Sequence, residues 1–200
     1  MIKFSERSLN SEMPPIVSIV GKSGSGKTTL IEKLIPELKR MGFRVGTIKH
    51  DVHGFEIDYP GKDSWRHKQA GSVTSVISSP HRIGMIKDVD HDYALDELAP
   101  LLYGVDIILS EGYKRENKPK IEVFRPEVHS RPLSLEDGNL IALVTDAVFD
   151  PGVPRFDKDD IKEVAHFLIA HFNLKKQIIQ TKNSANNSCE LDNVVIEKRI

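Results

Sequence analysis

The chain has 200 residues, of which 39% are hydrophobic and 28% are charged, a composition typical of a soluble globular domain. Its 28 lysines and arginines nearly balance 29 aspartates and glutamates, so the net charge of −1 excludes a global basic field that would hold nucleic acid. No apolar run approaches the roughly 18 to 20 residues of a membrane-spanning helix, and one cysteine, Cys189, excludes an internal disulfide or a cysteine-based metal site.

Three stretches of the chain differ in composition. Residues 1–15 are polar, lack periodicity and contain no apolar signal segment, which predicts a loose leader and a cytoplasmic protein. Residues 16–174 carry regular hydrophobic patterns and have the length of one domain of about 150 residues, so we expect them to form a single folded domain. Residues 175–200 are rich in Asn, Lys and Ser, which predicts a polar, flexible C-terminal tail.

The domain opens with a strand, a glycine-rich turn and a helix. Residues 16–20 form a β-branched run of the kind that is buried on both faces of a parallel sheet. Residues 44–49 predict a second strand, so the opening is a β-α-β unit with a right-handed crossover. Between the two strands, apolar residues recur at helical spacing until Gly42: Leu30, Ile31, Leu34, Ile35 and Leu38.

Helices and strands alternate along the rest of the domain. The patterns predict a polar loop over residues 51–61 and helices over residues 62–70, 93–103 and 159–172. Strands are expected at residues 72–78, 83–87, 105–109, 120–124 and 140–144. Because several of these strands are apolar throughout, we expect an α/β fold whose mostly parallel sheet is covered by helices on both faces.

Residues 21–28 match the phosphate-binding motif G-x-x-x-x-G-K-[ST] at every fixed position. The glycines let backbone N–H groups turn towards phosphate oxygens, and the start of the helix adds positive potential. Lys27 is expected to reach the β- and γ-phosphates, and Thr28 to coordinate Mg²⁺. Two roles are open to Thr29, an α-phosphate contact or only an early helix position. The predicted nucleotide-binding residues here are Gly21, Lys22, Ser23, Gly24, Ser25, Gly26, Lys27, Thr28 and Thr29.

A P-loop protein also needs an acidic residue near the metal, at the end of a neighbouring strand. Glu111 is the first candidate, because it follows an apolar strand and would emerge at the carboxyl edge of the sheet. Asp106, at the other end of that strand, is expected to mark its entry. Asp51 is an alternative metal ligand, although a turn-forming role suits it better. Thr28 and Glu111 are therefore the predicted metal ligands.

Base recognition is expected from the loop after the strand at residues 140–144. Asp146 there could accept two hydrogen bonds from the N1 and N2 groups of guanine, which adenine does not offer. The Asn-Lys-x-Asp quartet of many guanine-specific P-loop proteins is absent. Residues 157–160 add further acidic groups but equally suit the cap and first turn of the last helix. The residues alone thus favour guanine over adenine only weakly.

These motifs together resemble those of the molybdopterin-guanine dinucleotide biosynthesis adaptor protein B (MobB) family. The resemblance runs from about residue 16 to residue 172 and includes GKSGSGKTTL, TIKH (47–50), PGKDS (60–64), AGS (70–72), LSEGYK (109–114) and VTD (144–146). It implies a P-loop GTPase fold, GTP and Mg²⁺ as cofactors, a homodimer, and assistance to the guanylyltransferase that attaches GMP to molybdopterin. It also carries the acidic role to Glu111 and the phosphate role to Gly21, Gly24, Gly26, Lys27 and Thr28.

A basic rim is predicted beside the site. It could face a polyanionic pterin phosphate, such as molybdopterin, or acidic groups of a partner. For Arg66, His67 and Lys68, a solvated helix face is the favoured alternative. The pair of His50 and His53 is only weak evidence for a metal site. The rim consists of Lys49, His50, Lys62, Arg66, His67 and Lys68.

Two rival functions use the same phosphate loop. A small-molecule kinase would carry an arginine-rich lid, whereas only Lys114 and Arg115 follow the Glu111 strand. A GTPase that delivers metal would need a cluster of Cys or His, which the scattered histidines do not provide. The sequence also lacks a clear water-positioning glutamine and an arginine committed to the γ-phosphate, so GTP hydrolysis is expected to be weak.

Overall fold

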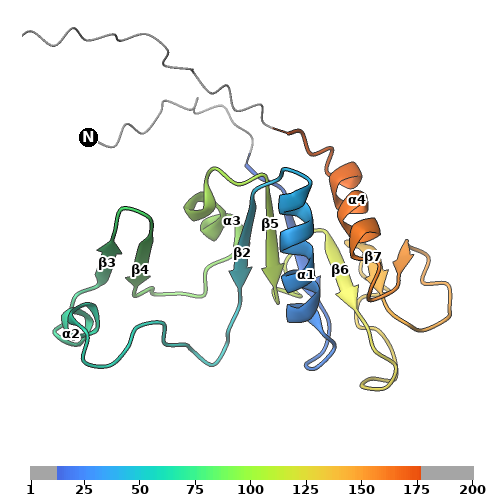
Figure 1. Cartoon of the computed structure of the whole chain (residues 1–200). Coiled ribbons are helices and arrows are strands. Elements are labelled where there is room, and N and C mark those ends of the chain that lie inside the picture. The colour runs from blue at the N-terminus through green and yellow to red at the C-terminus, as the bar shows by residue number, and fades with distance from the viewer. Residues whose placement is uncertain (1–12, 177–200) are drawn as a thin grey trace, which may run out of the picture.

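The computed structural model describes residues 13–176, which fold around a six-stranded sheet (Figure 1). The strands lie in the order β2-β5-β1-β6-β7-β8, and all neighbouring pairs are parallel, which confirms the predicted mostly parallel α/β sheet. The predicted leader up to residue 12 and the tail from residue 177, with Cys189, lie outside the described residues. The strand bounds are Ile16–Val20 (β1), Val45–Lys49 (β2), Ile107–Glu111 (β5), Lys120–Val123 (β6), Leu140–Val144 (β7) and Arg155–Phe156 (β8).

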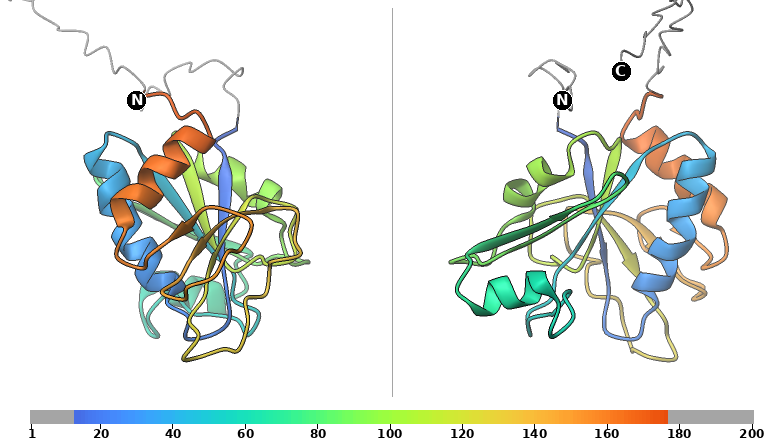
Figure 2. Two further views of the ribbon diagram at one scale, coloured as in Figure 1. Left: turned by 90° about the vertical axis from the view of Figure 1, so that its right-hand side faces the viewer. Right: turned by 60° about the vertical axis from the view of Figure 1, so that its left-hand side comes forward.

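Helices cover both faces of this sheet, as predicted. On one face, α1 (Lys27–Arg40) and α4 (Ile161–His171) lie over the main core (Figure 2). Leu30, Leu34 and Leu38 are buried there because their spacing places them on one side of α1, and each buried leucine contributes about 1.5 to 3 kcal/mol. The opposite face carries the short α3 (Leu95–Leu98) and the 3₁₀ helix η1 (Ala99–Leu102) over a smaller apolar cluster.

The helix predicted over residues 93–103 is wrong in part. The α-helix spans only Leu95–Leu98, and the 3₁₀ helix η1 replaces its continuation. Pro100 explains the change, because it lacks the N–H group that a further α-helical hydrogen bond requires. In the described part of the chain, no helix combines the length and the apolar character needed to cross a membrane.

The strand predicted from residue 105 begins two residues later, at Ile107. Asp106 stands immediately before it, where its carboxylate accepts hydrogen bonds from the backbone N–H of Arg44 at 2.7 Å and from the guanidinium of the same arginine at 2.7 and 3.1 Å. Asp106 therefore joins the start of β5 to the residue that precedes β2, which agrees with its predicted place at the strand entry.

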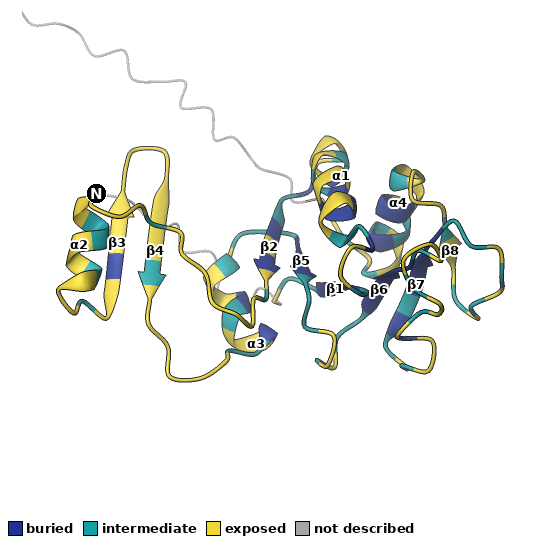
Figure 3. Ribbon diagram, turned by 90° about the horizontal axis from the view of Figure 1, so that it is seen from below, coloured by how far each residue is buried: buried dark blue, intermediate teal, exposed yellow. Residues whose placement is uncertain are grey.

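Residues 51–92 leave the main sheet and form what we call the arm. It contains α2 (Asp63–Gln69) and the antiparallel strands β3 (Thr74–Ser78) and β4 (Ile83–Lys87), which make a separate two-stranded sheet (Figure 3). The loop, the helix and both strands were predicted from sequence. Large apolar side chains stay exposed along the arm: Val52, Phe55, Ile57, Tyr59, Val73, Val76, Ile77, Ile83, Met85 and Val89.

Candidate nucleotide-binding site

The glycine-rich loop joins β1 to α1 at the carboxyl edge of the sheet, where ligands of open α/β sheets bind. Gly24 and Gly26 have φ angles of +75° and +98°, in the left-handed region that favours glycine. At Gly21 a Cβ atom would collide with the backbone carbonyl oxygen of Val123 and lie 2.7 Å from Oγ of Ser25. The loop backbone therefore runs so close to β6 that the motif's first position requires glycine.

The two predicted metal ligands meet at the start of α1. The Thr28 hydroxyl donates a hydrogen bond to Oε1 of Glu111 at 2.9 Å, across 83 residues of sequence. The sheet explains this contact, because β5 lies beside β1 and pairs Glu111 with Ile19, close to the beginning of the loop. A hydroxyl and a carboxylate are oxygen ligands of the kind that Mg²⁺ prefers, so this pair fits the ion.

The remaining loop side chains take different positions. The Lys27 ammonium donates a hydrogen bond to the carbonyl oxygen of Lys22 at 2.9 Å, so this side chain connects the end of the loop to its beginning. Ser23 is exposed, whereas Ser25 is fully buried and its hydroxyl has no hydrogen-bond partner among the described residues. Thr29 lines a small cavity beside the loop, which keeps both of its predicted roles open.

Asp51, the alternative metal ligand, takes the turn-forming role. Its side chain is exposed and accepts a hydrogen bond from the backbone N–H of His53 at 2.9 Å, the geometry of an Asx turn. Among residues 13–176 no group of three or more His, Cys, Asp or Glu side chains is arranged to hold a metal ion. His50 is engaged instead with Asp92, at 3.0 and 3.1 Å from its carboxylate oxygens, and stacks on Tyr113.

Two loop-binding residues were missed by sequence reasoning. Arg125 follows β6, and its Nε donates to the carbonyl oxygen of Ser25 at 2.9 Å. His129, in the same segment, has its Nε2 3.1 Å from the carbonyl oxygen of Ser23. The available signal was the position of Arg125 directly after a predicted strand, but which strand lies beside β1 is decided only by the sheet order.

Asp146 follows β7, on the side of the loop away from Glu111 in the sheet order. Its Oδ2 accepts a hydrogen bond from the Lys158 ammonium at 2.6 Å, whereas its buried Oδ1 has no partner among the described residues. The Lys158 ammonium holds the pKa of the Asp146 carboxyl below its ordinary value. Asp146 is therefore an ionised acceptor, but of the two oxygens that the predicted guanine contact requires, one is paired with Lys158 and the other is buried.

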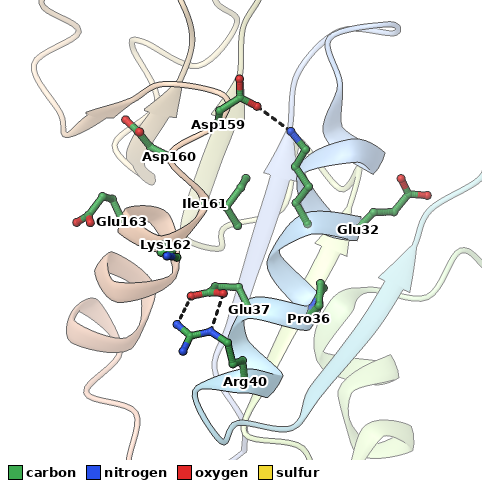
Figure 4. A pocket seen from close by; sticks show the side chains of 10 residues that line it. Glu32, Pro36, Glu37, Arg40, Asp159, Asp160, Ile161, Lys162 and Glu163 are labelled. Carbon is green, nitrogen blue, oxygen red and sulfur yellow. Dashed lines mark hydrogen bonds and ion pairs between the residues drawn. The ribbon is translucent and has the colours of Figure 1, made fainter.

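A cavity of about 140 Å³ lies beside the loop and is lined by Gly26, Thr29, Arg125 and Lys158, among others. The Lys33–Asp159 ion pair, at 2.8 Å, closes one side by joining α1 to the segment that precedes α4. A separate hollow of about 770 Å³ lies between α1 and α4 (Figure 4). Its charged groups include the Lys33–Asp159 pair and the Arg40–Glu37 pair, at 2.6 Å. The cavity that adjoins the phosphate loop is thus the smaller one.

The predicted basic rim is only partly brought together. Lys49 ends β2 beside Glu111 and His50 follows it, whereas Lys62 and the three basic residues of α2 lie in the arm. Arg66 pairs with Asp63 at 3.7 Å, and Lys68 with Asp88 at 2.6 Å. Arg66 and Lys68 of α2 are thus paired with carboxylates of the arm itself, which agrees with the alternative that this helix face is only solvated.

Comparison with known proteins supports the family resemblance that the sequence motifs indicate. A family model described as "MobB: Molybdopterin guanine dinucleotide synthesis protein B" matches residues 16–146. The molybdopterin-guanine dinucleotide biosynthesis adapter protein of Haemophilus influenzae is 38% identical over 162 residues, which cover 80% of this chain and 90% of that protein. The protein of the same name from Escherichia coli is 36% identical over 162 residues and is covered to 93% of its length.

Solved structures agree with the fold. A structure described as the crystal structure of Bacillus subtilis MobB superposes with a TM-score of 0.64 at 30% identity, covering 82% of this chain and 99% of that chain. A crystal structure of molybdopterin-guanine biosynthesis protein B gives a TM-score of 0.63 at 31% identity, covering 79% of this chain and 99% of that chain. The predicted P-loop NTPase fold is thereby confirmed.

Proposed function

The chain belongs to the MobB family, and on that premise we propose that it is a GTP-binding adaptor in molybdopterin-guanine dinucleotide biosynthesis. It binds GTP together with Mg²⁺ and assists the guanylyltransferase that attaches GMP to molybdopterin. The adapter role is the one named for its bacterial relatives, and the chain covers most of the length of both.

The observation that carries the nucleotide proposal is the hydrogen bond between Thr28 and Glu111. It supports a site in which these oxygens hold Mg²⁺, which neutralises charge on the β- and γ-phosphates when bound. Lys27 donates to the same phosphates, and the backbone N–H groups of the glycine loop surround them. Asp146 accepts from the guanine edge once its side chain rotates, because its Oδ2 is paired with Lys158 and its Oδ1 is buried in the structure.

We propose that this adaptor hydrolyses GTP only slowly. Lys114 and Arg115, the basic residues that follow the Glu111 strand, are exposed and make no hydrogen bond to the described residues. Arg125 does contact the loop, but it follows β6 rather than β5 and so lies on the side opposite Glu111. Fast hydrolysis in P-loop GTPases depends on an arginine that stabilises the transition state.

We further propose that the arm joins two copies of the chain. The homodimer is implied by the family resemblance, and the exposed apolar side chains of β3 and β4 support this location. A two-stranded sheet alone is marginally stable in water, so the arm gains stability by packing against a second copy. The main sheet, whose core is already covered by helices, has less apolar surface to offer.

Two measurements test this function. Calorimetry with GTP should show binding that requires Mg²⁺, and Glu111→Gln should lose the Mg²⁺ dependence while the exposed Glu136→Gln control retains it. At GTP concentrations that saturate the guanylyltransferase, the wild-type chain should raise the rate of molybdopterin guanine dinucleotide formation, and Lys27→Ala should not. Absence of Mg²⁺-dependent GTP binding, or equal stimulation by both proteins, would contradict the proposal.

A further inference from the structure

We propose that Arg125 binds the α-phosphate of the nucleotide, an inference that rests on the proposed function and adds a residue outside the phosphate-binding motif. Arg125 follows β6, and β6 and β5 flank β1 on opposite sides. The guanidinium therefore approaches the loop from the side opposite Glu111. The metal and the β- and γ-phosphates belong to the Glu111 side, so Arg125 faces a different part of the same ligand.

Distances place the Arg125 guanidinium against the second half of the loop. Its Nε donates to the carbonyl oxygen of Ser25 at 2.9 Å, and its Nη2 lies 3.0 Å from the point where a Cβ would stand on Gly26. A side chain at Gly26 would therefore crowd the guanidinium. The backbone N–H groups of this part of a P-loop, at the start of the helix, are those that cradle the α- and β-phosphates.

The guanidinium also has unused donors. Its two terminal nitrogens make no hydrogen bond to the residues that the structure describes, and Arg125 lines the cavity of about 140 Å³ beside Thr29 and Lys158. A planar guanidinium with free N–H groups can bind two oxygens of one phosphate at once, and its positive charge strengthens both hydrogen bonds. The chemistry of the cavity wall therefore points to an anionic ligand group.

The position of Arg125 along the ligand follows from its neighbours. On one side lies the loop with Lys27 and Thr28, which serve the outer phosphates. On the other lies Asp146, whose pKa is lowered mainly by Lys158 and to a smaller extent by the charge of Arg125. In a nucleotide the α-phosphate is the phosphate nearest the base, so it lies between these two sites.

The test compares the binding of GTP, GDP and GMP, which all carry the α-phosphate. Arg125→Gln should weaken all three by a similar factor, about ten- to a hundredfold for one charge-assisted contact. Competition against a fluorescent GDP analogue gives the three dissociation constants in one assay. Arg131→Gln, which removes the same charge from an exposed arginine of the same segment, should leave them unchanged.

Two results would overturn the inference. Unchanged affinity of Arg125→Gln would show that the guanidinium does not touch the ligand. A loss confined to GTP and GDP, with GMP binding retained, would show that Arg125 only braces the loop through Ser25, because a distorted loop loses its outer-phosphate contacts. Failure of the wild-type chain to bind any of the three nucleotides would instead refute the proposed function, and this inference with it.

Discussion

The predicted contact between Lys27 and the phosphates can be tested with a single substitution. Its ammonium lies across the loop, 2.9 Å from the carbonyl oxygen of Lys22. A charge-assisted contact to phosphate is worth about 1.5 to 3 kcal/mol, so Lys27→Ala should weaken GTP binding about ten- to a hundredfold. Calorimetry with Mg²⁺ present measures the change, and Lys39→Ala, on the exposed face of the same helix, is the matched control. Equal affinities of the two variants would contradict the phosphate role of Lys27.

We expect Asp146 to determine the preference for guanine over adenine. Because the proposed guanine contact uses the Asp146 carboxylate, whose pKa Lys158 lowers, Asp146→Ala should weaken GTP binding far more than ATP binding and so reduce the preference for guanine. Binding constants of the variant for both nucleotides give the ratio. Asp157→Ala, in the nearby acidic run, should keep the wild-type preference. Equal losses for GTP and ATP in the Asp146 variant would assign that residue a structural role.

At the scale of elements, β6 positions the segment that reaches the phosphate loop. The side chain of Glu122, in the middle of β6, is fully buried and accepts hydrogen bonds from the backbone N–H groups of Leu133 at 2.6 Å and Ser134 at 2.8 Å. These bonds fix the far end of the segment that contains Arg125 and His129, whose side chains contact the loop.

Glu122→Gln should therefore destabilise the fold. An amide offers one acceptor oxygen where the carboxylate offers two, so one buried N–H group loses its partner at a cost of about 1 to 3 kcal/mol. Urea unfolding measures the difference in free energy. Glu127→Gln, at an exposed position of the same segment, should leave the midpoint unchanged. A wild-type midpoint for Glu122→Gln would show that the segment is not held through this carboxylate.

At the scale of the whole molecule, the arm should determine the oligomeric state. Val76 and Met85 face each other across β3 and β4, and both are exposed. If two copies pack through this surface, Val76→Asp should convert the dimer into a monomer because it would bury an unpaired charge. Light scattering after size-exclusion chromatography gives the mass. Ser130→Asp, at an exposed serine outside the arm, should remain dimeric, and a dimeric Val76→Asp would exclude this interface.

Turnover is also a property of the whole assembly. P-loop GTPases without a stabilising arginine hydrolyse GTP at about 10⁻⁴ to 10⁻³ per second, and a supplied arginine is worth about 10³- to 10⁵-fold. The isolated protein should therefore release phosphate slowly in a steady-state assay with Mg²⁺. A rate near about one per second without the guanylyltransferase, within the ordinary enzyme range, would make the chain a self-sufficient catalyst and contradict the adaptor role.

Local features of this protein could be predicted from the sequence because they depend on neighbouring residues. The β-branched run of β1, the glycines of the loop and the leucine spacing of α1 each determine the conformation of their own segment. The proximity of Thr28 and Glu111 was also predicted, since the carboxyl ends of parallel strands share one edge of the sheet. The helix predicted over residues 93–103 was wrong beyond Leu98, because hydrophobic periodicity takes no account of the N–H group that Pro100 lacks.

The order of the strands was decided only by the tertiary structure. An apolar run indicates a buried strand, but it does not state which strands will flank β1. Because β6 lies there, Arg125 meets a carbonyl oxygen 100 residues earlier in the chain. The same limit applies to β3 and β4, whose alternating pattern predicts strands but not a sheet of their own. Pairing depends on contacts between distant segments, and the residues of one segment do not encode their partner.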